Sequence, residues 1–326
     1  MLRAAVIGIG AMGKNHVRIY TDLDNVKLIA VADCDSEQVK KITNKYNIKG
    51  YINYLEMLNK EKIDLVSVVV PTTLHKQVAI DAINKGINVL LEKPIATTIS
   101  EAKEIIKKAK EKKVKLMIGH IERFNPAVIE LKKRLDELGD IYKINVERIG
   151  PFPLRITDVG VVIDLSVHDI DIINYLLSGK PMSIYAETQQ RIHPDHEDTL
   201  TAILKYKNNV IAVLNINWLT PTKIRHLTVT GRKGMFKINY LTQDIYFYEN
   251  KSQTSEYDYG FLSVTEGNMT KIQIDRKEPL KQEIESFIEC IEKDKEPMVT
   301  GGDGLNALLF AQKILQSAKD HKIIKL

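Results

Sequence analysis

Three side chains that can handle protons and negative charge follow or begin apolar segments of the chain. Lys93 stands just after the apolar run Ile87–Leu91, and a lysine ammonium there can stabilise the charge that develops on an alkoxide oxygen. His168 is an imidazole, which near neutral pH can take the proton of a hydroxyl group. Asp164 precedes His168 by four residues, so on a helix both lie on one face and the carboxylate can orient the imidazole. These residue types suit the oxidation of an alcohol.

Each of these side chains also has an interpretation without chemistry. A lysine after a buried strand is often only a solvated strand end. Asp164 can cap the helix that begins there, and His168 can be a packed core histidine. The chemistry therefore depends on the elements that surround these positions.

A glycine motif near the start of the chain predicts a cofactor. Gly8, Gly10 and Gly13 follow the apolar run Ala4–Ile7 in the pattern G-x-G-x-x-G, and a helix-like stretch through Ile19 comes next. In a dinucleotide-binding unit the glycines allow a sharp turn, leave room for the pyrophosphate and let the helix pack on the strand. The helix N-terminus then offers free N–H groups to the phosphates. The predicted contacts are Gly8, Ile9, Gly10, Ala11, Met12 and Gly13.

The glycine motif alone is also compatible with a tight turn that binds no ligand. Asp33 favours the cofactor-binding interpretation. It ends the strand-like run Lys27–Ala32 and lies 20 residues beyond Gly13. An acid at this position accepts hydrogen bonds from the adenosine ribose and repels a 2′-phosphate. Cys34 and Asp35 follow, with no arginine to receive a phosphate, so NAD is expected as the cofactor rather than NADP.

Strands and helices alternate around these residues over 1–120, which predicts an α/β Rossmann-type domain with a doubly wound parallel sheet. The strand Ile63–Val70 is apolar almost throughout, as expected for a parallel strand buried on both faces. It runs into Pro71, Thr72 and His75, which become candidate cofactor contacts because such sheets bind ligands at their strand ends. The other expected strands are Ala4–Ile7, Lys27–Ala32, Ile87–Leu91 and Lys115–Ile118.

The pattern changes over residues 121–326, where alternating strand candidates and turn signals predict an α+β domain with a large, mostly antiparallel open sheet. The C-terminal helices can pack back on the first domain. The expected helices are Pro126–Leu138, Asp164–Leu177, Glu283–Lys293 and Gly304–Asp320. The expected strands are Ile141–Arg148, Met182–Gln190, Thr199–Tyr206, Val210–Trp218, His226–Gly231, Met235–Tyr240 and Asp244–Tyr248.

Composition excludes several classes of protein. The chain has 326 residues, too many for one typical core, and its charge of +5 is spread without a basic patch that would bind nucleic acid. Cys34 and Cys290 are its only cysteines, so neither a disulfide scaffold nor a zinc site is expected. It has no apolar run of membrane-spanning length and begins directly with a strand, so a cytoplasmic protein is expected.

Taken together, these motifs resemble the Gfo/Idh/MocA family of nicotinamide-dependent sugar oxidoreductases over essentially the whole chain. The resemblance implies that Lys93 hydrogen-bonds the reacting hydroxyl, that Glu92 and Lys93 also contact the nicotinamide side of NAD, and that His168 is the base beside Asp164. A metal at His168, Asp169 and Asp171 is not expected, because hydride transfer to a nicotinamide needs none when Lys93 and His168 handle the charge and the proton. The motifs that carry the resemblance are Gly8–Gly13 with His16, Pro71–His75, Glu92–Lys93–Pro94, Asp164–Asp171 and Thr300–Gly304.

The stretch Gly119–Ala127 resembles the branch of the family that oxidises the 3-hydroxyl of UDP-N-acetylglucosamine, before transamination to a diamino sugar. Arg123 and Arg155 are then candidates to bind the diphosphate, although either can simply pair with a surface carboxylate. Two alternatives stay open: a dehydrogenase of a free sugar or inositol, and a regulator that senses nicotinamide without catalysis. The resemblance also implies a homodimer or homotetramer through the open sheet. The expected substrate contacts are Lys93, Arg123, Arg155, Asp164 and His168.

Overall fold

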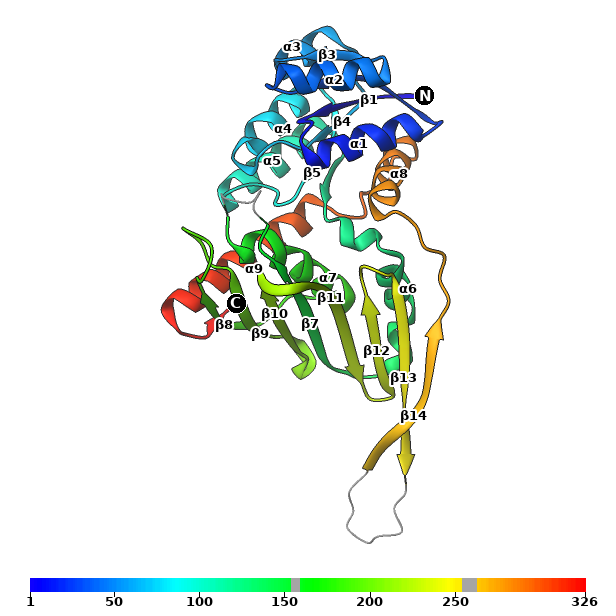
Figure 1. Cartoon of the computed structure of the whole chain (residues 1–326), viewed down its shortest axis with the longest axis vertical. Coiled ribbons are helices and arrows are strands. Elements are labelled where there is room, and N and C mark those ends of the chain that lie inside the picture. Colours follow the sequence, from blue (N-terminus) through cyan, green and yellow to red (C-terminus); the bar gives the residue numbers. More distant parts are fainter. Residues whose placement is uncertain (154–158, 254–262) are drawn as a thin grey trace. The chain divides into compact units, whose positions relative to one another are not determined.

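Two compact units make up the chain in this computed structural model, which describes residues 1–153, 159–253 and 263–326 (Figure 1). The first unit contains residues 1–124 together with 278–309, and the second contains 125–277 together with 310–326. The sequence placed a single border near residue 120. Each unit therefore combines two separate stretches of chain.

A six-stranded parallel sheet forms the centre of the first unit, with the strand order β3-β2-β1-β4-β5-β6. The chain reverses its direction of travel across the sheet between β1 and β4, which is where a doubly wound sheet binds its ligands. The expected Rossmann-type fold is thus confirmed. The strands are β1 (Leu2–Ile7), β2 (Val26–Ala32), β3 (Lys49–Tyr51), β4 (Leu65–Val68), β5 (Asn88–Glu92) and β6 (Leu116–Gly119).

Helices connect these strands and bury apolar stripes against the sheet. Ala4, Ala5 and Val6 of β1 are completely buried, as are Val17 and Ile19 of the first helix. Burial on both faces explains why the strands read as continuous apolar runs. The helices are α1 (Ala11–Asp22), α2 (Ser36–Tyr46), α3 (Tyr54–Lys60), α4 (His75–Asn84) and α5 (Ile99–Lys112).

The end of the chain completes the first unit. The amide of Ile118 in β6 donates to the carbonyl of Val299 at 3.1 Å, so residues near 300 run along the edge of the sheet. Helix α8 (Pro279–Glu292) packs against α1 and against the short turn η2 (Ile121–Phe124). Helix α9 (Gly301–Asp320) follows, and its first part belongs to this unit.

A nine-stranded sheet forms the second unit, with the order β14-β13-β12-β11-β7-β10-β9-β8-β15. Its pairings are antiparallel except for β7 with β10, so the expected mostly antiparallel sheet is confirmed. The sequence predicted neither β14 nor β15, and it placed the start of β11 at His226, seven residues after the observed start. The strands are β7 (Ile141–Pro151), β8 (Ser183–Gln189), β9 (Thr199–Lys205), β10 (Ile211–Asn217), β11 (Leu219–Gly231), β12 (Gly234–Asn239), β13 (Asp244–Gln253), β14 (Ser263–Ile272) and β15 (Ile324–Lys325).

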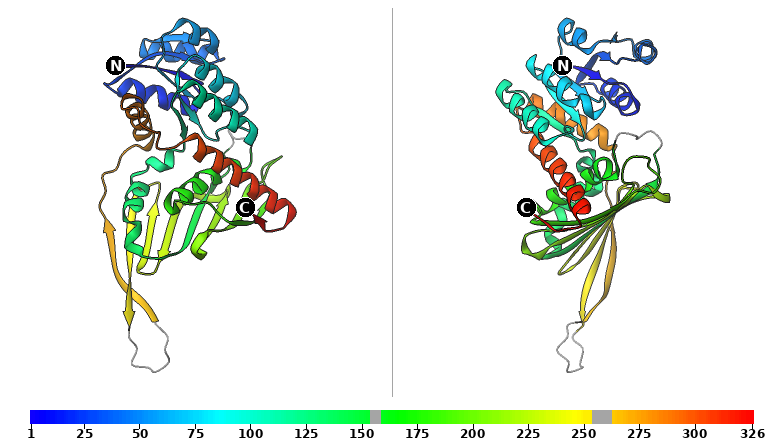
Figure 2. Two further views of the ribbon diagram at one scale, coloured as in Figure 1. Left: turned by 180° about the vertical axis from the view of Figure 1, so that it is seen from behind. Right: turned by 90° about the vertical axis from the view of Figure 1, so that its left-hand side faces the viewer.

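One face of this sheet is covered by helices and the other is open, as the edge-on view in Figure 2 shows. Helices α6 (Pro126–Arg134) and α7 (Val167–Leu177), with the end of α9, lie on the covered face. Side chains alternate accordingly in β9, where Leu200, Ala202 and Leu204 are buried and their neighbours are not. This alternation is the pattern expected of a sheet with one solvated face.

The helix that carries the predicted base differs from its expected form. A π-helical turn over Val162–Ser166 precedes α7, so the helix starts two residues before Asp164 rather than at it. Glu197, from the segment between β8 and β9, supplies the cap: its carbonyl accepts from the Val161 amide at 2.9 Å and its Oε1 from the Val162 amide at 3.1 Å. Asp164 is therefore not the capping residue. Single π turns of this kind occur frequently at functional sites.

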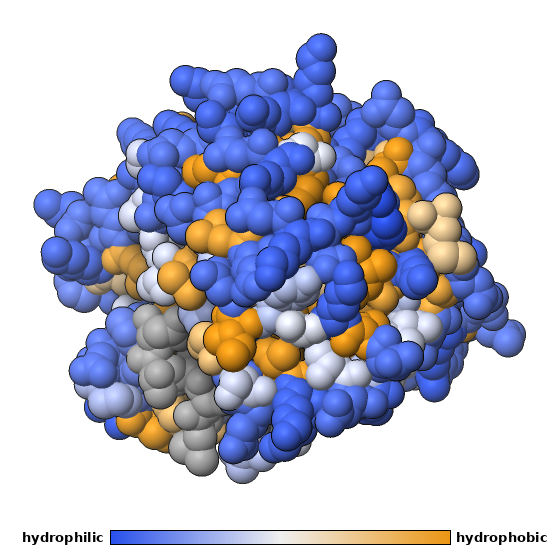
Figure 3. Space-filling view, turned by 90° about the horizontal axis from the view of Figure 1, so that it is seen from above, coloured by the Kyte–Doolittle hydropathy of each residue, from blue (hydrophilic) through white to orange (hydrophobic). Residues whose placement is uncertain are grey.

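Charged and polar side chains dominate the face seen in Figure 3, where apolar side chains form small, separated groups. This agrees with a charged fraction of 27% for the chain. Among the described residues, no helix has both the length and the apolar character needed to cross a membrane.

Candidate active site

The glycine loop of the first unit has the shape that a dinucleotide requires. Gly8 adopts φ = +88°, and a Cβ on it would collide with the carbonyl oxygen of Val69. A Cβ on Gly13 would collide with the carbonyl of Gly8, so α1 approaches the loop as closely as the motif predicts. Gly10 differs, because a Cβ there would meet no heavy atom within 4 Å. The chain thus turns tightly at Gly8, packs closely at Gly13 and leaves open space beside Gly10.

The N-terminus of α1 is suited to an anion. Gly10 is its N-cap and supplies no side chain, and the first turn contains no acidic residue. The first amides of a helix carry partial positive charge and need acceptors. These features fit the pyrophosphate of NAD, which Gly8 to Gly13 would hold.

Asp33 lies beside this loop at the end of β2. Its Oδ2 accepts a hydrogen bond from the Ile9 amide at 2.7 Å, and its Oδ1 accepts one from the Asp35 amide at 2.9 Å. The carboxylate therefore ties the glycine loop to the second strand. Each oxygen keeps a further lone pair, which suits the predicted hydrogen bonds from a ribose.

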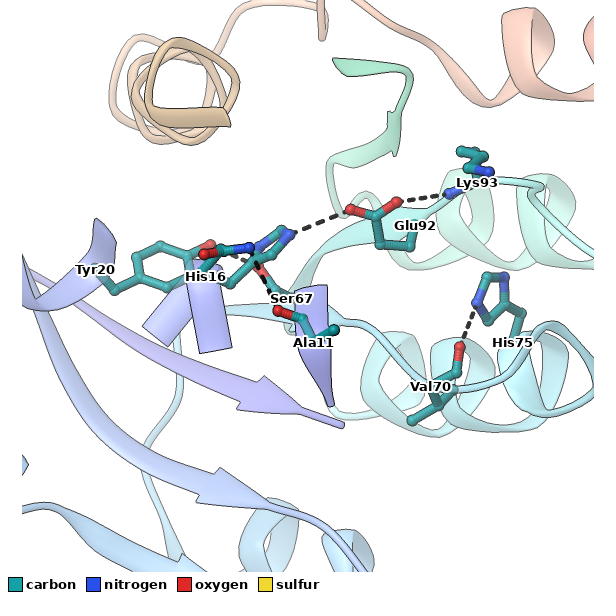
Figure 4. Close-up of polar contacts among 9 residues, drawn as sticks. Ala11, His16, Tyr20, Ser67, Val70, His75, Glu92 and Lys93 are labelled. Atoms are coloured by element: carbon teal, nitrogen blue, oxygen red, sulfur yellow. Dashed lines mark hydrogen bonds and ion pairs between the residues drawn. The ribbon is translucent and has the colours of Figure 1, made fainter. Parts of the chain in front are cut away.

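The Glu92–Lys93–Pro94 turn begins at the last residue of β5, and Figure 4 shows the contact between Glu92 and the Lys93 amide. The amide of Lys93 donates to Oε2 of Glu92 at 3.2 Å. The buried ring of His75 lies with Nδ1 2.8 Å from the carbonyl oxygen of Pro94 and Nε2 3.0 Å from that of Val70. Burial lowers the pKa of His75, whereas its contacts with these two carbonyl groups act to raise it. The side chain of Lys93 itself is half-buried.

A chain of buried polar groups runs from α1 to this turn. The hydroxyl groups of Tyr20 and Ser67 lie 2.9 Å apart, and Ser67 Oγ lies 3.0 Å from Nδ1 of His16. The other ring nitrogen, Nε2, lies 3.2 Å from Oε1 of Glu92. Tyr20, Ser67 and His16 are completely buried. The predicted cofactor residue Glu92 is thus fixed by α1 and β4 as well as by its own strand.

A second buried carboxyl group lies near this chain. Glu283 of α8 is completely buried, and neither of its oxygens has a hydrogen-bond partner in the described residues. Burial, and then the charge of Glu92, raise the pKa of Glu283 well above its ordinary value of 4.5. Burial also acts to raise the pKa of Glu92, but the hydrogen bond and charge of His16, with the charge of Lys93, outweigh it and lower that pKa. The negative charge therefore resides on Glu92 and the proton on Glu283.

Replacing Glu283 by Gln is expected to stabilise the protein increasingly as the pH rises. The folded-state pKa of Glu283 is raised, so its favourable contribution is complete below about pH 4.5 and is lost as the pH climbs toward that raised value. One proton of difference changes the free energy of unfolding by about 1.4 kcal/mol per pH unit. Urea unfolding of both proteins between pH 5 and 9 measures the difference. If the free energies of unfolding of the two proteins depended on pH in the same way, the assignment of the proton to Glu283 would be wrong.

Asp164 and His168 belong to the second unit. Asp164 lies within the π-helical turn, where its amide donates to the carbonyl of Gly160 at 3.0 Å, and His168 is the second residue of α7. Both side chains are half-buried. A π-helical turn contains more residues than an α-helical turn, because its hydrogen bonds join residues five apart. Asp164 and His168 are four residues apart, which is slightly less than one such turn, so they project from similar sides of the helix.

A buried ion pair fixes the helix that carries His168. Arg148 of β7 donates from Nε to Oδ2 of Asp169 at 2.6 Å, and the two side chains are 5% and 0% exposed. The guanidinium carbon also lies 5.1 Å from the centre of the Tyr240 ring. Because Asp169 follows His168 directly, the pair sets the rotation of α7 about its axis over the sheet.

Arg123 and Arg155 differ from the other predicted residues. Arg123 is 4% exposed; its guanidinium pairs with Asp303 at 3.1 Å and donates to the carbonyl oxygen of Met298 at 3.1 Å. Its place in the first unit thus includes a structural role, and a contact with substrate stays a prediction. Arg155 lies outside the described residues. Pro71 is exposed and Thr72 is half-buried, at the start of the short turn before α4.

Several residues around the site were not found from the sequence. Ser67 gave one signal, since it is a polar residue inside an otherwise apolar strand and therefore needs a partner. Tyr20 and Glu283 gave none, because each stands in a helix among ordinary apolar positions. Arg148 and Asp169 stand 21 residues apart, and only the packing of α7 on β7 brings them together.

Comparison with known proteins agrees with the fold of both units. Residues 2–120 match the model of an oxidoreductase family with an NAD-binding Rossmann fold, and residues 128–237 match a GFO/IDH/MocA C-terminal domain. The two matches together span well over half of the chain. The expected cofactor, NAD, is therefore confirmed at the level of the family.

Individual relatives include enzymes with different substrates. UDP-N-acetylglucosamine 3-dehydrogenase of Acidithiobacillus ferrooxidans is 26% identical over 96% of both chains. A solved structure of that enzyme superposes with a TM-score of 0.87, covering 98% of both chains at 26% identity. Myo-inositol 2-dehydrogenase of Thermotoga maritima is 25% identical and covers 100% of this chain and 98% of its own.

Proposed function

Because the chain belongs to the Gfo/Idh/MocA family of oxidoreductases, we propose that it oxidises the 3-hydroxyl of UDP-N-acetylglucosamine with NAD. The family and its relatives make it an NAD-dependent sugar dehydrogenase, and the proposal concerns which sugar it uses. The observation that carries it is the likeness to UDP-N-acetylglucosamine 3-dehydrogenase over 96% of both sequences. The product would be a 3-keto sugar nucleotide, which an aminotransferase can convert into a diamino sugar.

Four residues of the chain have roles in this reaction. Lys93, whose backbone Glu92 fixes, would donate to the substrate oxygen and stabilise its developing negative charge. His168 would take the hydroxyl proton, and Asp164 would orient that imidazole or hold a sugar hydroxyl. When bound, NAD accepts the hydride that leaves the same carbon.

An inositol or a free sugar is the second candidate substrate. Myo-inositol 2-dehydrogenase of Thermotoga maritima is almost as similar as the sugar-nucleotide enzyme and covers this chain completely. The proposed roles of Lys93 and His168 would be the same. A nicotinamide-sensing regulator is a third candidate, but a sensor requires neither of these two side chains.

Absorbance of NADH tests the proposal directly. Purified protein with NAD is offered UDP-N-acetylglucosamine, N-acetylglucosamine, glucose and myo-inositol in separate reactions. A ketone trap or a coupled aminotransferase removes a product that equilibrium disfavours. Signal with the UDP-sugar alone supports the proposal, while signal with a free sugar or inositol would overturn the substrate. Silence with all four, despite NAD binding, would favour the sensor.

The open face of the nine-stranded sheet is the surface through which we propose that the chain forms a homodimer or homotetramer. Tyr185 of β8 lies opposite Ile203 of β9, which lies opposite Val213 of β10, so an apolar row crosses three strands on this face. Tyr185 is 37% exposed and Ile203 is 46% exposed. Sedimentation equilibrium tests the proposal, and a monomer at micromolar concentration would refute it.

A further inference from the structure

The place of Asp33 fixes which half of the sheet receives which half of the cofactor. Asp33 ends β2, on one side of the point where the strand order reverses, and its type suits the adenosine ribose. The pyrophosphate belongs at the loop after β1. The nicotinamide half then belongs on the other side of the reversal, at the carboxyl ends of β4, β5 and β6. A charged group fixed at those ends would lie on the nicotinamide side of the cofactor.

Oxidised and reduced cofactor differ in charge at this ring. The nicotinamide of NAD+ carries a positive charge, and hydride transfer leaves the ring of NADH neutral. A buried negative charge near the ring therefore favours NAD+ over NADH, with little effect on the parts that both forms share. A general binding residue would instead change both affinities by a similar factor.

Glu92 is such a charge. It is the last residue of β5, and its side chain is only 11% exposed. Both carboxylate oxygens are engaged, one with His16 and one with the Lys93 amide. A Cβ on the neighbouring Gly119 of β6 would stand 3.1 Å from Oε2, so the carboxylate fills the space beside that strand. The group is therefore held at the strand ends rather than solvated.

The surroundings also keep the charge on Glu92. Of the two buried carboxyl groups, only Glu92 has partners for its oxygens, whereas Glu283 is buried without them in the described part of the chain. Two such groups that interact cannot both ionise cheaply in a medium of low dielectric constant. The proton consequently resides on Glu283, and Glu92 remains the anion next to Lys93.

We propose that the Glu92 carboxylate, fixed by His16, sets the preference of this protein for NAD+ over NADH. It would help the oxidised cofactor to bind before oxidation of the substrate and the reduced cofactor to leave afterwards. The inference concerns the cofactor site alone and stands whichever sugar is oxidised.

Titrations with three probes test it. Calorimetry measures the dissociation constants of NAD+, NADH and ADP-ribose, which lacks the nicotinamide, for the wild type, Glu92→Gln and Glu283→Gln. Glu92→Gln is expected to weaken NAD+ relative to NADH on the order of tenfold, the effect of one nearby unit charge in a partly screened site. ADP-ribose binding should stay unchanged. Glu283→Gln replaces a neutral group by a neutral group and should keep the wild-type ratio.

Three results would overturn the proposal. Equal losses for NAD+ and NADH would show that Glu92 only shapes the site, and unchanged affinities for both would show that its charge does not act on the nicotinamide. A shift in the ratio with Glu283→Gln as large as that with Glu92→Gln would show that the negative charge is not confined to Glu92. Should Glu92→Gln fail to bind ADP-ribose, the pair Glu92→Asp and Glu92→Asn repeats the comparison at one smaller size. The proposal then requires the Asp variant alone to keep the preference.

Discussion

Lys93→Ala should lower kcat by roughly 10²- to 10³-fold while NAD still binds. Removing one preorganised donor from a developing oxyanion costs about this much in other enzymes. Lys93 follows β5, and its backbone is held by Glu92 and its neighbour Pro94 by His75, so truncating the side chain should leave the turn intact. Stopped-flow measurement of NADH formation gives kcat, and calorimetry with NAD gives the dissociation constant.

Two further variants separate the role of Lys93 from a general loss of positive charge. Lys103→Ala removes an exposed lysine of α5 and should retain full activity. Lys93→Arg keeps the charge but changes the shape of the donor, so it should recover only part of the rate. Normal turnover of Lys93→Ala would refute its catalytic assignment.

His168→Asn should lower kcat by about 10²- to 10⁴-fold, the usual contribution of a general base. The loss should be greatest at neutral pH and smaller at high pH, where hydroxide can take the proton instead. The helix should keep its place, because the buried pair of Arg148 and Asp169 holds α7 independently of the imidazole. The pH profile of kcat, measured from NADH formation, tests the prediction.

The control for this variant is His321→Asn. His321 is a surface histidine whose ring is 72% exposed and pairs with Glu187, so its replacement should leave the pH profile unchanged. A His168→Asn enzyme with the wild-type pH profile would show that another group is the base.

The first unit could be predicted closely because its strands are buried on both faces. Continuous apolar runs such as Ala4–Ile7 have few other interpretations. The strand β3 escaped because it has three residues, of which Lys49 and Gly50 are exposed. In the second unit, the early part of β11 contains Pro221 and a register irregularity between Leu219 and Ile224, so its sequence does not alternate regularly.

The site could be predicted where a short motif carries it and not where the tertiary fold assembles it. Gly8 to Gly13 and Asp33 stand at positions that local geometry dictates. The contact between His16 and Glu92 joins residues 76 positions apart, and no local pattern records it. Arg123 shows the opposite difficulty. Its residue type and its motif predict a substrate contact, but in the structure its guanidinium pairs with Asp303.

The composition of the first unit from residues 1–124 and 278–309 has a consequence for synthesis on the ribosome. Domains generally fold as units while the chain emerges from its N-terminus. Here the nucleotide-binding sheet emerges first, yet α8, the strand-edge partner of Ile118 and the buried Glu283 come from the last sixth of the chain. The nascent sheet therefore stays incompletely covered until residues 278–309 have been translated.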